Sequence, residues 1–249
     1  MALVLFLAAL CLAVGFGFGE KLLVFPAPSP GRPPAYPDRL IRSGDAAFLY
    51  FGGKTVVAYF HGNGEDLADS IPVVSLLRTL GMGVLALEYP GYGLAGGRPS
   101  EDAVYAAAET ALRWLRSEQG VEPARVVLLG WSLGSGVAAE MAKRQLGARL
   151  VLVAPFTSVV DMSRRMIPFL PASIIRDRFD TASKAGSIGI PVLIIHGTED
   201  GVVPFEMGRR LAAAFPQASL VPVEGGEHND LFTVHALELR NALAPFVKF

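Results

Sequence analysis

One serine near the middle of the chain has the surroundings that nucleophilic chemistry needs. Ser132 is the centre of the pentapeptide GWSLG (residues 130–134), which follows an apolar run over residues 126–129 and precedes a small-residue helical pattern over residues 135–146. This order predicts a strand, a sharp turn and a helix, with the serine at the turn. Such a turn strains the serine backbone, and its flanking glycines avoid Cβ collisions with the neighbouring strand or helix. The hydroxyl group would stand clear of the sheet, where the helix dipole favours negative charge.

An activated serine also needs a base within hydrogen-bond reach. His228 fits best among the four histidines, because it lies in a Gly-rich loop behind the last predicted strand. His61 precedes the serine, in a loop that we assign to an oxyanion donor. His196 ends a strand and is expected to be buried and structural, and His235 falls within a helical pattern.

The base in turn needs a carboxylate that orients it. Asp200 is the best candidate, because it follows the apolar strand over residues 191–195 and lies between Ser132 and His228 in the chain. Its neighbour Glu199 is the runner-up. Glu88 and Asp161 could also lie near the site, and we interpret both as structural carboxylates.

Acyl transfer further requires two backbone N–H donors aimed at the developing oxyanion. Leu133 supplies one, because it follows the nucleophile directly. Asn63 in the motif HGNG (residues 61–64) is the candidate for the second, since its loop follows an earlier strand and the flanking glycines allow close approach to a substrate.

The segments around these residues alternate between strand and helix. The predicted strands are residues 46–51, 54–60, 82–88, 126–129, 150–153, 191–195 and 219–223. The predicted helices run to about residue 80 from a cap at Asp66 or a neighbour, from Ser100 to about 118, and over about 135–146, 204–215 and 231–246. This alternation predicts an α/β fold with a mostly parallel central sheet, helices on both faces, and functional residues at the carboxyl ends of the strands.

Two regions qualify this pattern. Gly52-Gly53 would join the first two strands as a hairpin. Residues 156–190 break the alternation and predict one helix plus a small cap over the sheet. The apolar residues of this cap fit either a wall for an acyl chain or the ordinary packing of a crossover helix.

The N-terminal part of the chain is organised differently. Residues 1–19 carry no charged side chain and would form a helix roughly 28 Å long, close to the thickness of a bilayer core. We interpret them as an uncleaved membrane anchor, with a cleaved signal segment as the alternative. A Pro-rich linker over residues 20–37 would then precede the domain at 38–249. The sequence leaves the side of the membrane open, and a cleaved leader would imply a secreted or periplasmic protein.

Composition argues against several other classes of protein. The chain has 22 basic and 23 acidic residues, a net charge of −1 and no basic cluster, so we expect no nucleic-acid partner. A single cysteine, Cys11, excludes an intrachain disulfide bond and a Cys-based zinc site. The histidines form no metal-binding pair of the H-E-x-x-H type. Chemistry by an activated serine needs neither a metal nor an organic cofactor, so we expect none.

Six motifs occur in the order found in serine hydrolases of the α/β-hydrolase fold. They are HGNGED, EYPGYG, GWSLGSG, APFTS, PVLIIHGTEDGVVP and GGEHND. The chain most resembles the small membrane-associated branch with acyl-protein thioesterases, lysophospholipase-like enzymes and bacterial esterases, over roughly residues 22–249. The chain departs from this branch in its short first predicted hairpin (residues 46–60), from which we expect the usual extra N-terminal strands to be trimmed.

The resemblance implies Ser132 as nucleophile, Asp200 as acid, His228 as base, and Asn63 with Leu133 as oxyanion donors. It implies cofactor-free hydrolysis of an acyl ester or thioester, in a small molecule, a lipid or an acylated protein. Two alternatives remain, namely a serine peptidase and a non-catalytic membrane-tethered binding protein on the same scaffold.

Overall fold

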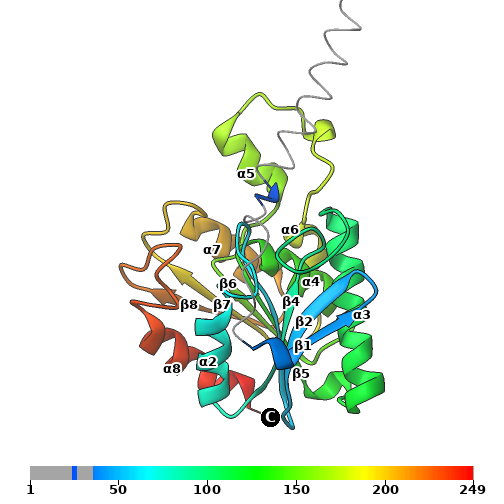
Figure 1. The fold of residues 1–249 in the computed structure, drawn as a ribbon. Helices are drawn as coiled ribbons and strands as arrows, with labels where there is room; N and C mark the ends of the chain where they lie inside the picture. The colour runs from blue at the N-terminus through cyan, green and yellow to red at the C-terminus, as the bar shows by residue number, and fades with distance from the viewer. Residues whose placement is uncertain (1–23, 27–35, 249) are drawn as a thin grey trace, which may run out of the picture.

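An eight-stranded sheet forms the centre of the molecule (Figure 1). The computed structural model describes residues 24–26 and 36–248. The strand order is β1-β2-β4-β3-β5-β6-β7-β8. The strands are β1 (Leu40–Ser43), β2 (Ala46–Phe51), β3 (Val56–Phe60), β4 (Gly83–Glu88), β5 (Val126–Trp131), β6 (Arg149–Val153), β7 (Val192–Gly197) and β8 (Ala218–Val223).

Most of this sheet is parallel, as the alternating pattern predicts. All pairs from β4 across to β8 are parallel, whereas β1 and β2 form an antiparallel edge. Every residue of β3 and β4 is buried, because helices cover both faces and leave no solvated side for polar residues. The prediction of an α/β fold is confirmed.

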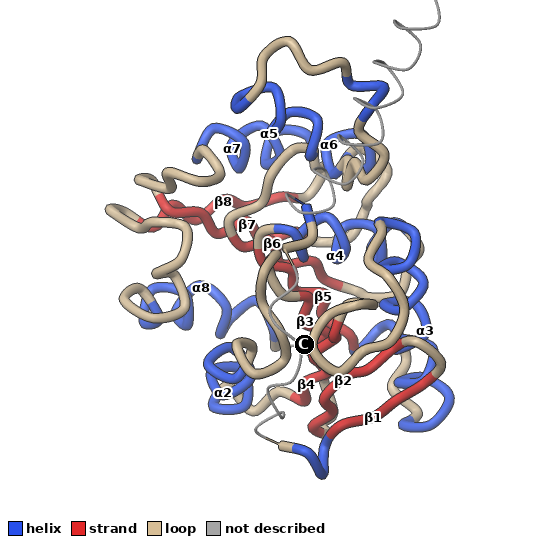
Figure 2. Tube along the Cα trace, turned by 45° about the horizontal axis from the view of Figure 1, so that its top comes forward, coloured by secondary structure: helices blue, strands red, loops and turns tan. Residues whose placement is uncertain are grey.

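The helices divide between the two faces of the sheet (Figure 2). On one face, α3, α4, α6 and α7 pack in one apolar cluster, and on the other face α2 and α8 pack in a second. The α-helices are α2 (Ile71–Thr79), α3 (Glu101–Gln119), α4 (Leu133–Lys143), α5 (Val159–Met166), α6 (Thr181–Ala185), α7 (Phe205–Ala214) and α8 (Ala236–Val247). The 3-10 turns are η1 (Pro37–Arg39), η2 (Pro123–Arg125) and η3 (Ala172–Ile174).

The cap predicted within residues 156–190 contains α5, η3 and α6. Helix α5 and the segment that follows it stand above the carboxyl edge of the sheet, whereas α6 packs against α4 (Figure 1). Ser158 begins α5 by accepting a hydrogen bond from the Asp161 amide.

The hairpin predicted at Gly52-Gly53 is wrong. Strand β2 pairs antiparallel with β4, and β4 lies between β2 and β3. The glycines instead allow close contact with the start of β4, since a Cβ on Gly53 would lie 2.4 Å from the amide nitrogen of Gly83.

The edge of the sheet also differs from the expectation of trimmed N-terminal strands. Strand β1 adds an edge strand, joined to β2 by a two-residue turn in which Gly44 has a φ of +57°. This hairpin therefore lies one strand earlier in the chain than predicted, and its turn uses the left-handed conformation that glycine adopts freely.

Two predicted helices begin later than expected. Helix α2 begins at Ile71, with Pro72 in its first turn, and Asp66 instead caps a separate turn by accepting hydrogen bonds from the Ala68 and Asp69 amides. Helix α8 begins at Ala236, because turns occupy the residues between 231 and 235. The predicted start of α3 is confirmed, since the Ser100 hydroxyl accepts from the Ala103 amide.

The predicted membrane segment at residues 1–19 lies outside the described residues, as does most of the predicted linker. Within the described ranges, no helix has the length and apolar character needed to cross a membrane. Val24 and Phe25 fall in the range predicted as linker, yet both are buried against the domain. The packed part of the chain therefore includes residues before position 38.

Candidate active site

The turn around Ser132 is strained in the way its pentapeptide predicts. Ser132 lies between β5 and α4 with a φ of +50°, a left-handed conformation that is unfavourable for a residue with a side chain. Its amide donates to the Val153 carbonyl at 3.0 Å, and its carbonyl accepts from the Ser135 hydroxyl at 2.6 Å. These bonds hold the turn against the sheet and the helix.

The flanking glycines let the turn pack closely on its neighbours. A Cβ on Gly134 would lie 2.0 Å from the Phe60 carbonyl oxygen of β3. A Cβ on Gly130 would lie 2.1 Å from the carbonyl oxygen of Gly134 itself. Both positions therefore exclude any side chain, because the atoms in the way belong to the backbone.

Three predicted side chains meet at the carboxyl edge of the sheet. The Nε2 of His228 lies 3.0 Å from the Ser132 hydroxyl, and its Nδ1 lies 2.8 Å from Oδ2 of Asp200. A carboxylate can only accept, so Nδ1–H donates to Asp200 and the Nε2 of the neutral ring accepts from the serine. This arrangement lets the imidazole take the serine proton.

Contact between two loops brings the acid and the histidine together. The loop after β7 carries Asp200, and the loop after β8 carries His228. Glycines bring the two segments into contact, since a Cβ on Gly197, the last residue of β7, would lie 2.1 Å from the Gly226 carbonyl oxygen. The Glu199 amide donates to that same carbonyl at 3.0 Å.

Asp200 is held by several donors besides His228. Its Oδ1 accepts from the amides of Val202 and Val203 at 2.9 and 2.7 Å. The buried His196 donates from Nε2 to the Val203 carbonyl, and this nitrogen lies 3.3 Å from Oδ2 of Asp200. Burial alone would raise the pKa of Asp200, but the bonds from His196, His228 and the Val203 amide hold it well below its ordinary value.

The depressed pKa of Asp200 predicts a loss of stability in acid. The unfolded carboxyl protonates first, near pH 4, so the stabilisation is complete above that pH and declines as pH falls toward the folded pKa. We expect the free energy of unfolding of wild type to exceed that of Asp200→Asn at pH 7. This difference should shrink by up to about 1.4 kcal/mol per pH unit below pH 4.

Urea unfolding of both proteins between pH 7 and pH 3 measures this effect. Glu199→Gln is the matched control, because it removes the exposed carboxylate of the adjacent residue. A difference between wild type and Asp200→Asn that stays constant from pH 5 to pH 3 would contradict the prediction.

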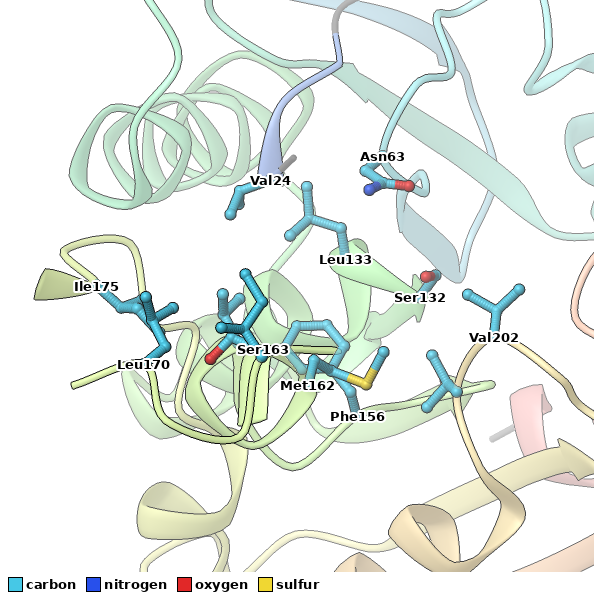
Figure 3. Close-up of a pocket in the computed structure, with 13 residues that line it drawn as sticks. Val24, Asn63, Ser132, Leu133, Phe156, Met162, Ser163, Leu170, Ile175 and Val202 are labelled. Carbon is cyan, nitrogen blue, oxygen red and sulfur yellow. The ribbon is translucent and has the colours of Figure 1, made fainter. Parts of the chain in front are cut away.

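The predicted oxyanion donors lie beside the serine. Asn63 and Leu133 line the same cavity as Ser132, and Figure 3 shows the three side by side. Leu133 is the first residue of α4, where backbone N–H groups have no partner within the helix. The loop that carries Asn63 and the start of α4 thus meet around one serine.

Comparisons with known proteins agree with this architecture. The model of a family described as the Alpha/beta hydrolase family matches residues 56–188, and a model described as TAP-like protein matches residues 170–236. An uncharacterized protein of Mycobacterium tuberculosis strain H37Rv is 34% identical over 226 residues, which cover 85% of this chain and 80% of the relative. The chain belongs to the alpha/beta hydrolase family.

Two further similarities place this alpha/beta hydrolase among known proteins. Alpha/beta hydrolase domain-containing protein 17C of Xenopus tropicalis is 34% identical over 182 residues, which cover 72% of this chain and 58% of that protein. The solved structure of the Pyrococcus furiosus esterase Pf2001 shares the fold, with a TM-score of 0.73 and 18% identity over 90% of this chain and 98% of the esterase. Family membership supports hydrolase activity.

The loop over residues 61–64, which we predict to supply an oxyanion donor and call the oxyanion loop, rests on polar groups that the sequence did not identify as a cluster. His61 is buried below the loop, with its Nε2 3.3 Å from Oε1 of Glu88 and its carbonyl accepting from the Tyr89 hydroxyl at 2.7 Å. Glu65 accepts from the Gly62 amide at 2.9 Å. Burial alone would lower the pKa of His61, but the Glu88 carboxylate raises it. These contacts give the HGNG and EYPGYG motifs a shared role in holding the loop.

The remaining candidates are exposed or contact other groups. Glu199 is exposed, so Asp200 rather than its neighbour meets His228. Asp161 accepts from the Thr157 hydroxyl at 2.6 Å and lies 3.7 Å from Arg210. His235 lies 3.8 Å from Asp230, on the loop behind β8.

An apolar cavity of about 300 Å³ opens beside Ser132. Residues of the cap form much of its wall, including Phe156, Val159 and Met162. Val159 and Met162 also pack against the core below, so the cap both lines the cavity and packs as a crossover helix would. No group of three or more His, Cys, Asp or Glu side chains placed to hold a metal ion occurs within the described ranges.

Proposed function

We propose that this chain is a serine hydrolase that cleaves carboxylic esters or thioesters through an acyl-enzyme intermediate. One observation carries the proposal, namely the pair of hydrogen bonds that joins Ser132 to His228 and His228 to Asp200. A buried carboxylate, an imidazole and a strained serine in this order are the parts that acyl transfer requires.

In the first half of the reaction, the Ser132 oxygen bonds to the acyl carbonyl carbon while His228 takes its proton at Nε2. The carbonyl electrons move to oxygen, and the backbone N–H groups of Leu133 and Asn63 stabilise the oxyanion. The tetrahedral intermediate then expels the alcohol or thiol, which receives the proton from His228. Asp200 keeps the Nδ1–H tautomer and stabilises the imidazolium that forms in between.

In the second half, a water molecule loses its proton to His228 and bonds to the acyl carbon. The bond to Ser132 breaks, the serine oxygen recovers the proton, and a carboxylic acid leaves. These steps use groups of this chain and water alone.

Labelling with a fluorophosphonate, followed by peptide mass spectrometry, tests the proposal. We expect an adduct on Ser132 in wild type and none in Ser132→Ala or His228→Ala. Ser163→Ala is the matched control, because Ser163 lines the same cavity but bonds to the Val160 carbonyl rather than to a histidine. Folded wild-type protein that remains unlabelled would overturn the proposal in favour of a non-catalytic binding protein. Labelled protein that cleaves peptides but no ester or thioester would favour a peptidase.

We also propose that residues 1–19 attach this hydrolase to a membrane, on the basis of their uncharged, apolar sequence. Carbonate extraction of membranes from cells that express the full chain tests this proposal, with a deletion of residues 1–19 as the control. We expect the full chain to stay in the membrane fraction and the deletion to be released. A mature N-terminus beyond residue 19 would instead identify a cleaved leader and overturn the anchor.

A further inference from the structure

The cavity beside Ser132 is elongated rather than round. In Figure 3, Ser132 and Val202 lie at one end of the lining, whereas Leu170 and Ile175 lie at the other. Ile175 is 3% exposed, so its side chain is set into the protein at this far end. A cavity with a reactive atom at one end and aliphatic side chains at the other suits an unbranched apolar chain bonded to that atom.

One wall comes from a part of the chain far from the rest of the site in sequence. Val24 lines the cavity beside Leu133, across from Met162 of the cap (Figure 3). It is 7% exposed and therefore packs as a core residue does. No neighbouring residue in the sequence indicates that Val24 belongs to the site.

The residues after Val24 fix it in place. The Phe25 ring meets the Phe179 ring edge to face, with the centroids 5.9 Å apart, and Phe179 in turn packs against Gly136 of α4. Next to it, the Pro26 carbonyl lies against the oxyanion loop, 3.5 Å from where a Cβ on Gly64 would be. The aromatic contact and the close approach hold Val24 against the cavity.

We infer that this cavity is an acyl-chain subsite whose length limit is set by Val24 and Ile175. A methylene group occupies about as much space as a water molecule, roughly 30 Å³, so 300 Å³ holds an unbranched saturated chain of about eight to ten carbons. The inference rests on the proposed function, because the hydrocarbon chain in this cavity would belong to the acyl group bonded to Ser132.

A series of 4-nitrophenyl esters from two to sixteen carbons tests the inference. For wild type, kcat/KM should rise about fourfold per methylene up to eight to ten carbons and then fall, because each buried methylene contributes about 0.8 kcal/mol. Val24→Trp should move the optimum at least two carbons shorter by narrowing the cavity. Ile175→Ala should move it at least two carbons longer by opening the far end.

Val234→Trp is the matched control, because Val234 is 75% exposed and lies outside the cavity lining. It should keep the wild-type optimum, and circular dichroism checks that each variant is folded. Val24→Ala gives a second readout at the same position. It should make the fall of kcat/KM beyond ten carbons less steep, because it widens the cavity. A dependence of kcat/KM on chain length that matches wild type in every folded Val24 variant would overturn the inference.

A binding experiment separates this inference from the proposed function. In Ser132→Ala protein, fatty acids of graded length compete with a fluorescent fatty acid for the cavity, with no need for turnover. Binding that peaks at eight to ten carbons and shifts with Val24→Trp would support the subsite even if wild type hydrolysed no ester. Ester hydrolysis without any dependence on chain length would overturn the subsite and leave the proposed function standing.

Discussion

Ser132→Ala and His228→Ala should each lower kcat on an acyl ester by about 10⁴-fold to 10⁶-fold, as removal of a nucleophile or its base does in other serine hydrolases. The double variant should be no slower than the slower single variant, because the two residues act as one unit through their 3.0 Å hydrogen bond. Asp200→Asn should lower kcat by about 10⁴-fold, because an amide can stabilise the wrong histidine tautomer. Steady-state kinetics on a short ester measures all four proteins.

The control for these kinetics is Ser117→Ala, which should keep kcat within about threefold of wild type, because Ser117 is exposed on α3, its hydroxyl bonds to Glu118, and it lies outside the cavity lining. Residual activity in the single variants would come from the oxyanion donors and substrate binding, which remain intact. A double variant whose loss equals the product of the two single losses would contradict a joint mechanism, since independent groups add in free energy.

Gly134→Ala should destabilise the fold by at least about 4 kcal/mol, a loss large enough to prevent soluble expression. The new methyl group would lie 2.0 Å from the Phe60 carbonyl oxygen, so either β3 or α4 must shift to accept it. Both elements are buried in the centre of the molecule, where close packing leaves no space for such a movement. Urea unfolding, or the soluble yield if the variant does not fold, measures the effect.

Gly186→Ala is the matched control for this prediction. A Cβ there meets no atom within 4 Å, and the residue has a right-handed φ of −63° at the end of α6. The substitution should change stability by less than about 1 kcal/mol. If Gly134→Ala were as stable as Gly186→Ala, the close contact between the serine turn and β3 would be wrong.

Features that depend on neighbouring residues could be read from the sequence. The Ser100 cap was predicted correctly, because a hydroxyl side chain and the amide three residues later make a local contact. The turn at Ser132 was recognisable for the same reason, since its glycines and flanking apolar run lie within a few residues. The sequence also singled out Asp200 and His228, because the strands before them are apolar and their loops are polar.

Features that depend on residues far apart in the chain could not be predicted from the sequence. The hairpin at Gly52-Gly53 was predicted from two adjacent strands, yet the partner of β2 is β4, whose register the local pattern does not specify. The contact between His196 and Asp200 depends on how the loop after β7 folds back over the strand's end. Burial of Val24 depends on a surface built from α4 and the cap.

The sequence by itself determined the type of fold, the strained serine and the residues able to serve it as acid and base. These follow from the periodicity of apolar residues and from short-range steric rules, which act within a few positions of the chain. Only the tertiary structure decided that the loops after β7 and β8 meet, so that Asp200 contacts His228, and that Val24 lines the cavity beside Ser132. Both depend on contacts between segments far apart in the chain, and such contacts exist only once the sheet and its loops are assembled.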